Sequence, residues 1–192
     1  MKMVLCTGNA GKVAELLALL PSDIELVGLN DVGMPSDLPE TQETLEGNAI
    51  QKATYVFERT GLTCIADDTG LEVHALGGAP GVRSARYAGM DKDPQANIHR
   101  LLAELQGRSD RSARFRTVVA LVGSNGVHTF EGVVEGAIAY APMGSKGFGY
   151  DPVFVPEDGG LTFAEMDSAA KNAISHRARA VQALVRYLAA AR

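Results

Sequence analysis

The sequence predicts an α/β protein built as one domain. Short apolar runs that end in turn residues alternate with longer stretches in which apolar residues recur at helical spacing. Two long strand-like runs are separated by an Asn-Gly turn, the strongest short-range signal for a β-hairpin. With 192 residues, the chain can bury one large core, as a single domain or as a domain with two lobes.

The N-terminal half predicts a strand-turn-helix unit followed by strands and a second helix. The first helix follows a glycine-containing turn and ends before Pro21, and the second ends near Gly61. In chain order, we expect a strand at 3–6, a turn at 7–12, a helix at 13–20, a strand at 24–28, a loop at 30–43, a helix at 44–59 and a strand at 62–66.

The C-terminal half predicts one helix, the long hairpin and a final helix. It also contains two glycine-rich loops, in which glycine and proline set the backbone conformation. In chain order, we expect a loop at 77–81, a helix at 94–105, strands at 113–122 and 127–139, a second loop at 142–149, a short strand within 151–156 and a helix at 169–191.

Composition narrows the classes of function. The chain is 46% hydrophobic and 21% charged, as in ordinary globular proteins, and its net charge of −5 disfavours nucleic acid as a partner. No run is long enough to span a membrane, and the N-terminal apolar run is too short for a signal peptide. Cys6 and Cys64 lie in apolar runs without a disulfide pattern. We therefore expect buried free thiols in a cytoplasmic protein.

Two adjacent carboxylates follow the strand at 62–66. Asp67 and Asp68 cannot both point into one pocket while the strand continues, because successive strand side chains alternate between faces. One acid at the carboxyl end of a strand is where α/β enzymes place their chemistry. The alternative is a polar turn that ends the strand, since Asp, Thr and Gly are turn residues.

Three further segments carry side chains or backbone groups that could bind a ligand. The turn at 7–12 places backbone N–H groups at a helix N-terminus beside Lys12, although it lacks the spacing of a Walker A loop. Phe148, flanked by glycines, could stack on a base or plug the core beneath its loop. On a continuous final helix, Asn172 and His176 would share one face, and the cations Lys171 and Arg177 would lie early in the helix, where its dipole disfavours them.

Five segments, taken together and in order, resemble the inosine triphosphate pyrophosphatase family over residues 4 to about 188. They are Thr7-Gly8-Asn9-x-x-Lys12-x-x-Glu15, Ala66-Asp67-Asp68-Thr69-Gly70-Leu71, Gly78-Ala79-Pro80-Gly81 through Ser84-Ala85-Arg86-Tyr87, Gly147-Phe148-Gly149-Tyr150-Asp151-Pro152, and Ser175-His176-Arg177.

This resemblance implies an elongated two-lobed α/β fold with a long mixed sheet flanked by helices, an active site in the cleft between the lobes, a homodimer and Mg²⁺. It implies hydrolysis of ITP, dITP and XTP to the monophosphate and pyrophosphate. Asp68 would be the general base and a metal ligand with Glu40, for which Glu43 or Glu46 could substitute. The implied substrate-binding residues are Thr7, Gly8, Asn9, Ala10, Gly11, Lys12, Thr69, Phe148, Gly149, Tyr150, Asp151, Lys171, His176 and Arg177.

The donors of Arg177 and His176 would select the 6-oxo group of hypoxanthine or xanthine over the 6-amino group of adenine. Two alternatives remain open. A sister family of the same fold acts on pyrimidine or methylated nucleotides, and its motifs differ around His176 and Arg177. A non-catalytic nucleotide sensor would need the anion-binding loops but no base, and the Asp67-Asp68 pair argues against it.

Overall fold

The structure, a computed structural model, describes residues 1–190 and has a mixed α/β fold. Its sheet has the strand order β2-β1-β3-β5-β6-β7, with β4 paired to β3. The strands are β1 (Lys2–Leu5), β2 (Glu25–Val27), β3 (Cys64–Val73), β4 (Pro80–Gly81), β5 (Ser112–Gly123), β6 (Gly126–Ile138) and β7 (Phe154–Pro156). The helices are α1 (Ala10–Leu19), α2 (Leu45–Thr60), α3 (Pro94–Glu104), α4 (Ser168–Ile174) and α5 (His176–Ala190), with short 3-10 turns at Asn30–Val32, His74–Leu76 and Ser84–Arg86.

The chain divides into two compact units. The first comprises Met1–Asp68, Thr117–Gly132 and the C-terminal segment from Arg177, and the second comprises Thr69–Arg116 and Val133–His176. The division passes between Asp68 and Thr69 on β3, so the paired carboxylates belong to the first unit. That the active site lies in a cleft between two lobes stays a prediction.

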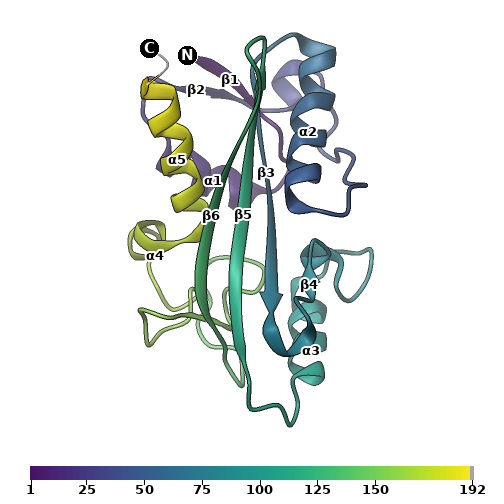
Figure 1. Cartoon of the computed structure of the whole chain (residues 1–192), viewed down its shortest axis with the longest axis vertical. Coiled ribbons are helices and arrows are strands. Elements are labelled where there is room, and N and C mark those ends of the chain that lie inside the picture. Colours follow the sequence, from purple (N-terminus) through teal and green to yellow (C-terminus); the bar gives the residue numbers. More distant parts are fainter. Residues whose placement is uncertain (191–192) are drawn as a thin grey trace. The chain divides into compact units, whose positions relative to one another are not determined.

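In the first unit, β1 pairs in parallel with both β2 and β3, as strand-helix-strand connections require. Helices α1 and α5 lie on one side of these strands and α2 lies on the other (Figure 1). The apolar stripes of α1 and α5 pack on the strands, with Leu16, Val181 and Leu184 buried against Met3 and Ile65. Burial of these stripes fixes the helices that carry the polar site residues.

Capping residues set where the helices of the first unit begin and end. Asn9 caps α1 by accepting a hydrogen bond from the backbone N–H of Lys12, and Thr44 caps α2 by accepting one from Gly47. Helix α2 ends at Gly61, whose φ of 68° is the left-handed conformation that glycine adopts readily. The predicted beginnings and ends of both helices are confirmed to within a few residues.

In the second unit, aromatic and aliphatic side chains form the core together. Phe115 of β5 contacts Phe154 edge to face, at 4.7 Å between ring centroids, and stacks on Phe163. Strands β5 and β6 are joined through Ser124 and Asn125, which confirms the predicted hairpin.

Both cysteines are buried and free, as expected. Among residues 1–190, no helix combines the length and apolar character that crossing a bilayer demands.

Two expectations about element boundaries were wrong. Strand β3 does not end at Ala66 but continues to Val73, so Asp67 and Asp68 lie in its middle. The expected helix at 169–191 is two helices, because Ser175 has extended backbone angles between α4 and α5; residue 191 lies outside the described residues.

The break at Ser175 also changes the expected helix faces. Asn172 lies in α4 and His176 begins α5, so the two do not share a helix face. Lys171 lies in the last turn of α4, where the helix dipole favours a cation, so the expected unfavourable position of Lys171 was also wrong.

Candidate active site

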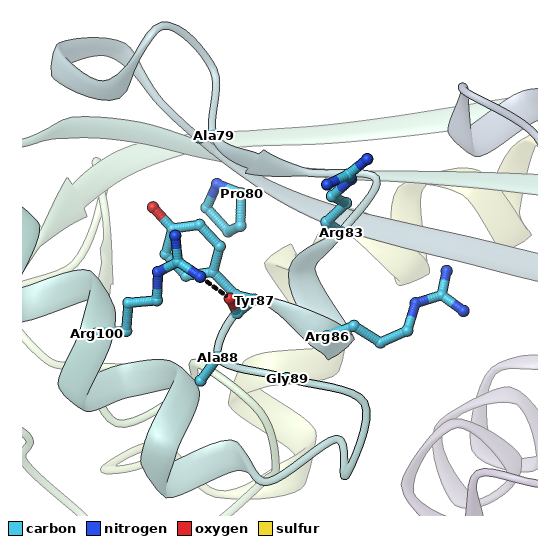
Figure 2. A pocket seen from close by; sticks show the side chains of 8 residues that line it. All are labelled: Ala79, Pro80, Arg83, Arg86, Tyr87, Ala88, Gly89 and Arg100. Carbon is cyan, nitrogen blue, oxygen red and sulfur yellow. Dashed lines mark hydrogen bonds between the residues drawn. The ribbon is translucent and has the colours of Figure 1, made fainter.

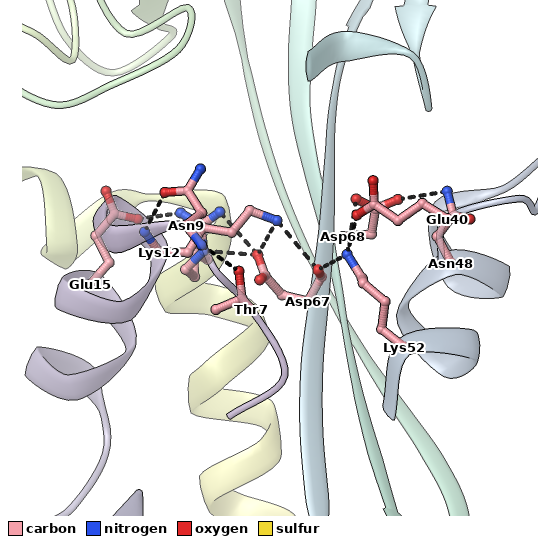
Figure 3. A network of polar contacts seen from close by, with 10 residues as sticks. Thr7, Asn9, Lys12, Glu15, Glu40, Asn48, Lys52, Asp67 and Asp68 are labelled. Carbon is pink, nitrogen blue, oxygen red and sulfur yellow. Dashed lines mark hydrogen bonds and ion pairs between the residues drawn. The ribbon is translucent and has the colours of Figure 1, made fainter. Parts of the chain in front are cut away.

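Asp67 and Asp68 project from opposite faces of β3, as strand alternation predicts (Figure 3). The side chain of Asp67 points toward α1, and that of Asp68 points toward α2 and the loop before it. Both are buried, Asp67 fully and Asp68 with 8% of its surface exposed. The two acids therefore occupy separate environments and can have separate tasks.

Asp68 lies against a small polar group contributed by α2 and the preceding loop. Its Oδ2 accepts a hydrogen bond from Asn48 Nδ2 at 3.1 Å, and its Oδ1 lies 3.7 Å from Lys52 Nζ. Lys52 Nζ also binds Glu40 Oε1 at 2.6 Å and the backbone carbonyl of Asp67 at 2.8 Å. This group places two carboxylates and one ammonium together on one face of β3.

Burial and charge set the pKa values in this group. Burial raises the pKa of Asp68, and the neighbouring Glu40 adds to the rise, while Lys52, Lys12 and the Asn48 hydrogen bond oppose it. Burial alone would lower the pKa of Lys52, but the charges of Asp68, Glu40 and Asp67 outweigh it and raise that pKa. The raised pKa of Asp68 makes it a stronger proton acceptor than an exposed aspartate, as a general base requires.

The carboxylates of Asp68 and Glu40 fit a divalent cation such as Mg²⁺. Mg²⁺ prefers oxygen ligands and is commonly held by one or two carboxylates together with substrate phosphates. Both carboxylates contact Lys52, so they face a common space. Glu43 and Glu46 are exposed. Within residues 1–190, no three His, Cys, Asp or Glu side chains form a ready-made metal centre. Asp68 and Glu40 would supply two carboxylate ligands, and substrate phosphate oxygens would supply the others, which is the set of ligands that Mg²⁺ commonly takes.

On the other face of β3, Asp67 is the centre of a buried ion-pair cluster. Its Oδ2 lies 3.1 Å from Lys12 Nζ and accepts hydrogen bonds at 3.1 Å from Nε and Nη2 of Arg177. Arg177 Nη1 donates to Glu15. Although burial would raise the pKa of Asp67, the cations Lys12, Arg177 and Lys52 outweigh it and lower that pKa far below its usual range. Asp67 therefore stays ionised.

The turn at 7–12 combines a helix N-terminus with Lys12. Thr7 Oγ1 accepts from the backbone N–H of Asn9, which fixes the turn ahead of α1. A Cβ at Gly8 would lie 2.7 Å from the carbonyl oxygen of Ser36, so only glycine fits there. Burial and the nearby cations lower the pKa of Lys12, and the carboxylates of Asp67 and Asp68 oppose this effect. The turn thus offers backbone N–H groups and one cation to an anion.

The second unit brings together another set of predicted residues. Lys171 Nζ binds Asp151 Oδ2 at 2.6 Å, and the same oxygen accepts a hydrogen bond from the backbone N–H of Phe148 at 2.8 Å. Lys171 Nζ lies 5.0 Å from the centroid of the Phe148 ring, a cation-π distance. Gly147 has a φ of 73°, and a Cβ there would collide with Asp151. These contacts shape the loop that carries Phe148, which is partly exposed.

Two predicted residues of this unit are structural in their visible contacts. The hydroxyl of Tyr150 is buried and donates to the carbonyl of Ser84 at 2.8 Å. The ring of His176 is buried and stacks on Phe115 at 4.5 Å between centroids. We therefore place Tyr150 and His176 in the framework of this unit, and their contact with a nucleotide stays a prediction.

The Ser84–Tyr87 segment of the third motif borders a cavity of about 320 Å³ (Figure 2). The guanidinium of Arg100 lies 4.4 Å from the Tyr87 ring centroid and donates to the Tyr87 carbonyl. Asn97 donates to Ala85 and accepts from Ala88, which ties the segment to α3. The cavity is lined by Ala79, Pro80, Arg83, Arg86, Tyr87, Ala88, Gly89 and Arg100.

The structure therefore groups the predicted site residues into two sets. The first unit holds Thr7, Gly8, Asn9, Ala10, Gly11, Lys12, Glu40, Asp68 and Arg177, and the second holds Thr69, Phe148, Gly149, Tyr150, Asp151, Lys171 and His176.

Sequence reasoning missed two polar residues of α2, Asn48 and Lys52. Both are buried, with 1% and 5% of their surfaces exposed, and both contact Asp68. Their spacing of four residues places them on one helix face, beside the buried Ala49, Ala53 and Val56. A pair of polar residues on an otherwise apolar helix face was the signal that could have identified them.

The sequence profile of the Ham1 family matches residues 3–187. The chain is 51% identical over 192 residues to a protein of Porphyromonas gingivalis named dITP/XTP pyrophosphatase, covering 100% of this chain and 99% of the relative. It is 46% identical to a Bacillus subtilis protein of the same name, covering 97% and 96%. The Ham1 protein of Staphylococcus aureus has a similar structure, with a TM-score of 0.91, 38% identity and full coverage of both chains. These comparisons confirm the resemblance noted in the sequence, and the chain belongs to the Ham1 family.

Proposed function

We propose that this protein hydrolyses noncanonical purine nucleoside triphosphates, ITP, dITP and XTP, to the monophosphate and pyrophosphate. Such an activity would remove these nucleotides from the cellular pool. The observation that carries the proposal is the polar site on β3. It combines the buried carboxylate of Asp68 with Glu40 and Lys52 in one unit of a Ham1-family chain, and Lys12 lies beside Asp67 on the other face of the strand.

In the proposed reaction, a water molecule adds to the α-phosphorus and the bond from that phosphorus to the α–β bridging oxygen breaks. Asp68 accepts the proton of the water, a step that contributes about 10²–10⁴-fold to the rate in comparable enzymes. Pyrophosphate leaves with the bridging oxygen. The position of Asp68, which contacts Asn48 and Lys52 on the face of β3 that carries Glu40, supports its assignment as the base.

The cations of the first unit would bind and stabilise the phosphates. The backbone N–H groups at the start of α1 and the ammonium of Lys12 suit an anionic triphosphate tail. Lys52, which is held between Glu40 and Asp68, is placed to share charge with the transition state. Because the chain's net charge is −5, this local group of cations is what attracts an anionic substrate.

Mg²⁺ held by the carboxylates of Asp68 and Glu40 would supply charge neutralisation to the phosphate oxygens. We assign Glu40 rather than Glu43 or Glu46 as the second ligand, because Glu40 and Asp68 both contact Lys52.

The nucleotide's base would stack on Phe148, and Asp151 and Lys171 would support the loop that carries this ring. From the family resemblance, we also propose that the protein is a homodimer and that it is located in the cytoplasm. Light scattering and cell fractionation test these two points.

A nucleotide panel tests the activity. Purified protein with Mg²⁺ is given ITP, dITP, XTP, GTP, ATP and dTTP, and released pyrophosphate is measured. We expect rapid release from the first three. Binding without pyrophosphate release would indicate a nucleotide sensor, and preferential hydrolysis of dTTP would favour the sister family that acts on pyrimidine nucleotides.

Heavy-oxygen water tests the bond that is cleaved. Attack at the α-phosphorus places the label in the monophosphate, and label found only in pyrophosphate would refute the proposed attack. The variants Asp68→Asn and Asp67→Asn test the separate roles of the two acids. We expect Asp68→Asn to abolish turnover and Asp67→Asn to retain more of it, because only Asp68 faces Glu40. Equal losses in both variants, with folding unchanged, would contradict the assignment.

A further inference from the structure

Asn48 joins the candidate base to the loop that carries Glu40. Its Nδ2 donates to Asp68 Oδ2 at 3.1 Å, while its Oδ1 accepts from the backbone N–H of Gln42 at 2.9 Å. The side chain is 1% exposed and stands on the first turn of α2, whose position is fixed by the Thr44 cap. One rigid amide thus contacts the two parts of the site that come from different segments.

The two partners of Asn48 fix the direction of its amide. The backbone N–H of Gln42 can only donate, so it must face Oδ1 of Asn48, and the Nδ2 group of Asn48 then points at Asp68. Flipping the amide would set two donors against each other at Gln42. The carboxylate of Asp68 therefore meets a donor on Oδ2, and its other oxygen, Oδ1, is turned toward Lys52.

We propose that Asn48 is a positioning residue, which sets the rotation of the Asp68 carboxylate and its position relative to the loop that carries Glu40. The inference rests on the proposed role of Asp68. Reacting groups must be held within fractions of an ångström, and an error of about 1 Å can reduce turnover about 100-fold. Substrate binding by the Lys12 turn does not depend on this amide, so Asn48 should act on kcat rather than on KM.

A second residue of α2 offers a matched control. Gln51 tethers the same loop, because its Oε1 accepts from the backbone N–H of Thr41 at 2.9 Å and its Nε2 donates to Thr41 Oγ1 at 2.8 Å. No contact of Gln51 with Asp68 is part of this tether. Gln51→Ala therefore loosens the loop without removing a donor from Asp68.

The experiment measures kcat and KM for dITP, the affinity for its non-hydrolysable imido analogue by calorimetry, and thermal unfolding. We expect Asn48→Ala to lower kcat about 10- to 100-fold with KM and analogue affinity little changed. Gln51→Ala should change kcat much less. Asn48→Asp keeps the acceptor for Gln42 but faces Asp68 with a second carboxylate, so it should lower kcat at least as far as Asn48→Ala while remaining folded.

Wild type and Asp68→Asn are measured in the same assay, which separates the possible failures. An inactive wild type would refute the proposed function, and an active Asp68→Asn would refute the role of Asp68. If both behave as expected, equal kcat values for Asn48→Ala and Gln51→Ala would overturn the inference about Asn48. A crystal structure of Asn48→Ala with an unchanged Asp68 rotamer would also overturn it.

Discussion

Replacing Arg177 with alanine tests whether the guanidinium belongs to a buried ion-pair cluster. Arg177 is 1% exposed, and Nε, Nη1 and Nη2 all donate to carboxylates of Asp67 and Glu15. Breaking a buried ion pair by removing one partner costs about 3–5 kcal/mol, because a buried charge is left uncompensated. Asp67 keeps Lys12 at 3.1 Å, so we expect the lower end of this range.

A loss of about 3 kcal/mol corresponds to a fall in Tm of about 6–12 °C for a chain of this length. Urea denaturation followed by circular dichroism measures the free energy of unfolding directly. Arg186→Ala is the matched control, since Arg186 is exposed on the same helix, α5. The control should change stability by less than about 0.5 kcal/mol. Removing Asp67 as well, in Arg177→Ala/Asp67→Asn, should cost less than the sum of the single changes, because neither charge is then left alone.

Equal stability of Arg177→Ala and Arg186→Ala would refute the ion-pair assignment and would favour the alternative in which Arg177 reads the base. The kinetic counterpart is the ratio of kcat/KM for ITP and ATP. If the guanidinium also meets the 6-oxo group, Arg177→Ala should shift this ratio toward ATP. A destabilised variant with an unchanged ratio would leave Arg177 with the task of holding Asp67.

The other predictions concern the metal, the phosphates and alkaline stability. Glu40→Gln should raise the Mg²⁺ concentration for half-maximal activity about tenfold or more, and the exposed Glu43→Gln should not; equal effects in a metal titration would exclude Glu40 as a ligand. Lys12→Ala should raise KM for dITP about tenfold or more, because a charge-assisted contact to phosphate is lost, and steady-state kinetics with an unchanged KM would contradict this. Burial and the adjacent Glu104 raise the pKa of Tyr87 to about 12 from 10.0, so its neutral form stabilises the fold fully below pH 10 and this contribution is lost as pH rises toward 12. Denaturation between these pH values should therefore show a shallower decline for Tyr87→Phe than for wild type, and identical declines would refute the role of Tyr87.

Local signals predicted much of the fold. The Asn125-Gly126 turn and the apolar stripes of α1 and α3 were readable because turn chemistry and amphipathic spacing are properties of neighbouring residues. The alternation of Asp67 and Asp68 was also readable. Family resemblance supplied the residues of both sets, since their gathering depends on contacts that no local pattern encodes.

The misses have a common physical origin in long-range compensation. The sequence Asp67-Asp68-Thr69-Gly70 has the composition of a turn, yet β3 runs through it because cations from α1, α2 and α5 neutralise the buried carboxylates. Arg177 lies 110 residues from Asp67 along the chain, so its burial could not be read locally. The break at Ser175 was hidden because good helix formers are frequent in the segments before and after it, at 169–171 and 177–180.

One strand can hold two carboxylates in different states because the strand separates them. Neighbouring carboxylates sharing a pocket would repel each other, and one would bind a proton. On β3, Asp67 meets Lys12 and Arg177, whose charges lower its pKa, whereas burial raises the pKa of Asp68 and the neighbouring Glu40 adds to the rise. This division depends on strand register, which the parallel pairing of Leu5 with Ile65 fixes next to the site. A slip of one residue would exchange the faces of all side chains in the strand. It would turn Asp68 to the face that carries Arg177 and Asp67 to the face that carries Glu40, so the packing of Ile65 in the core is a condition for the chemistry that begins two residues further along the strand.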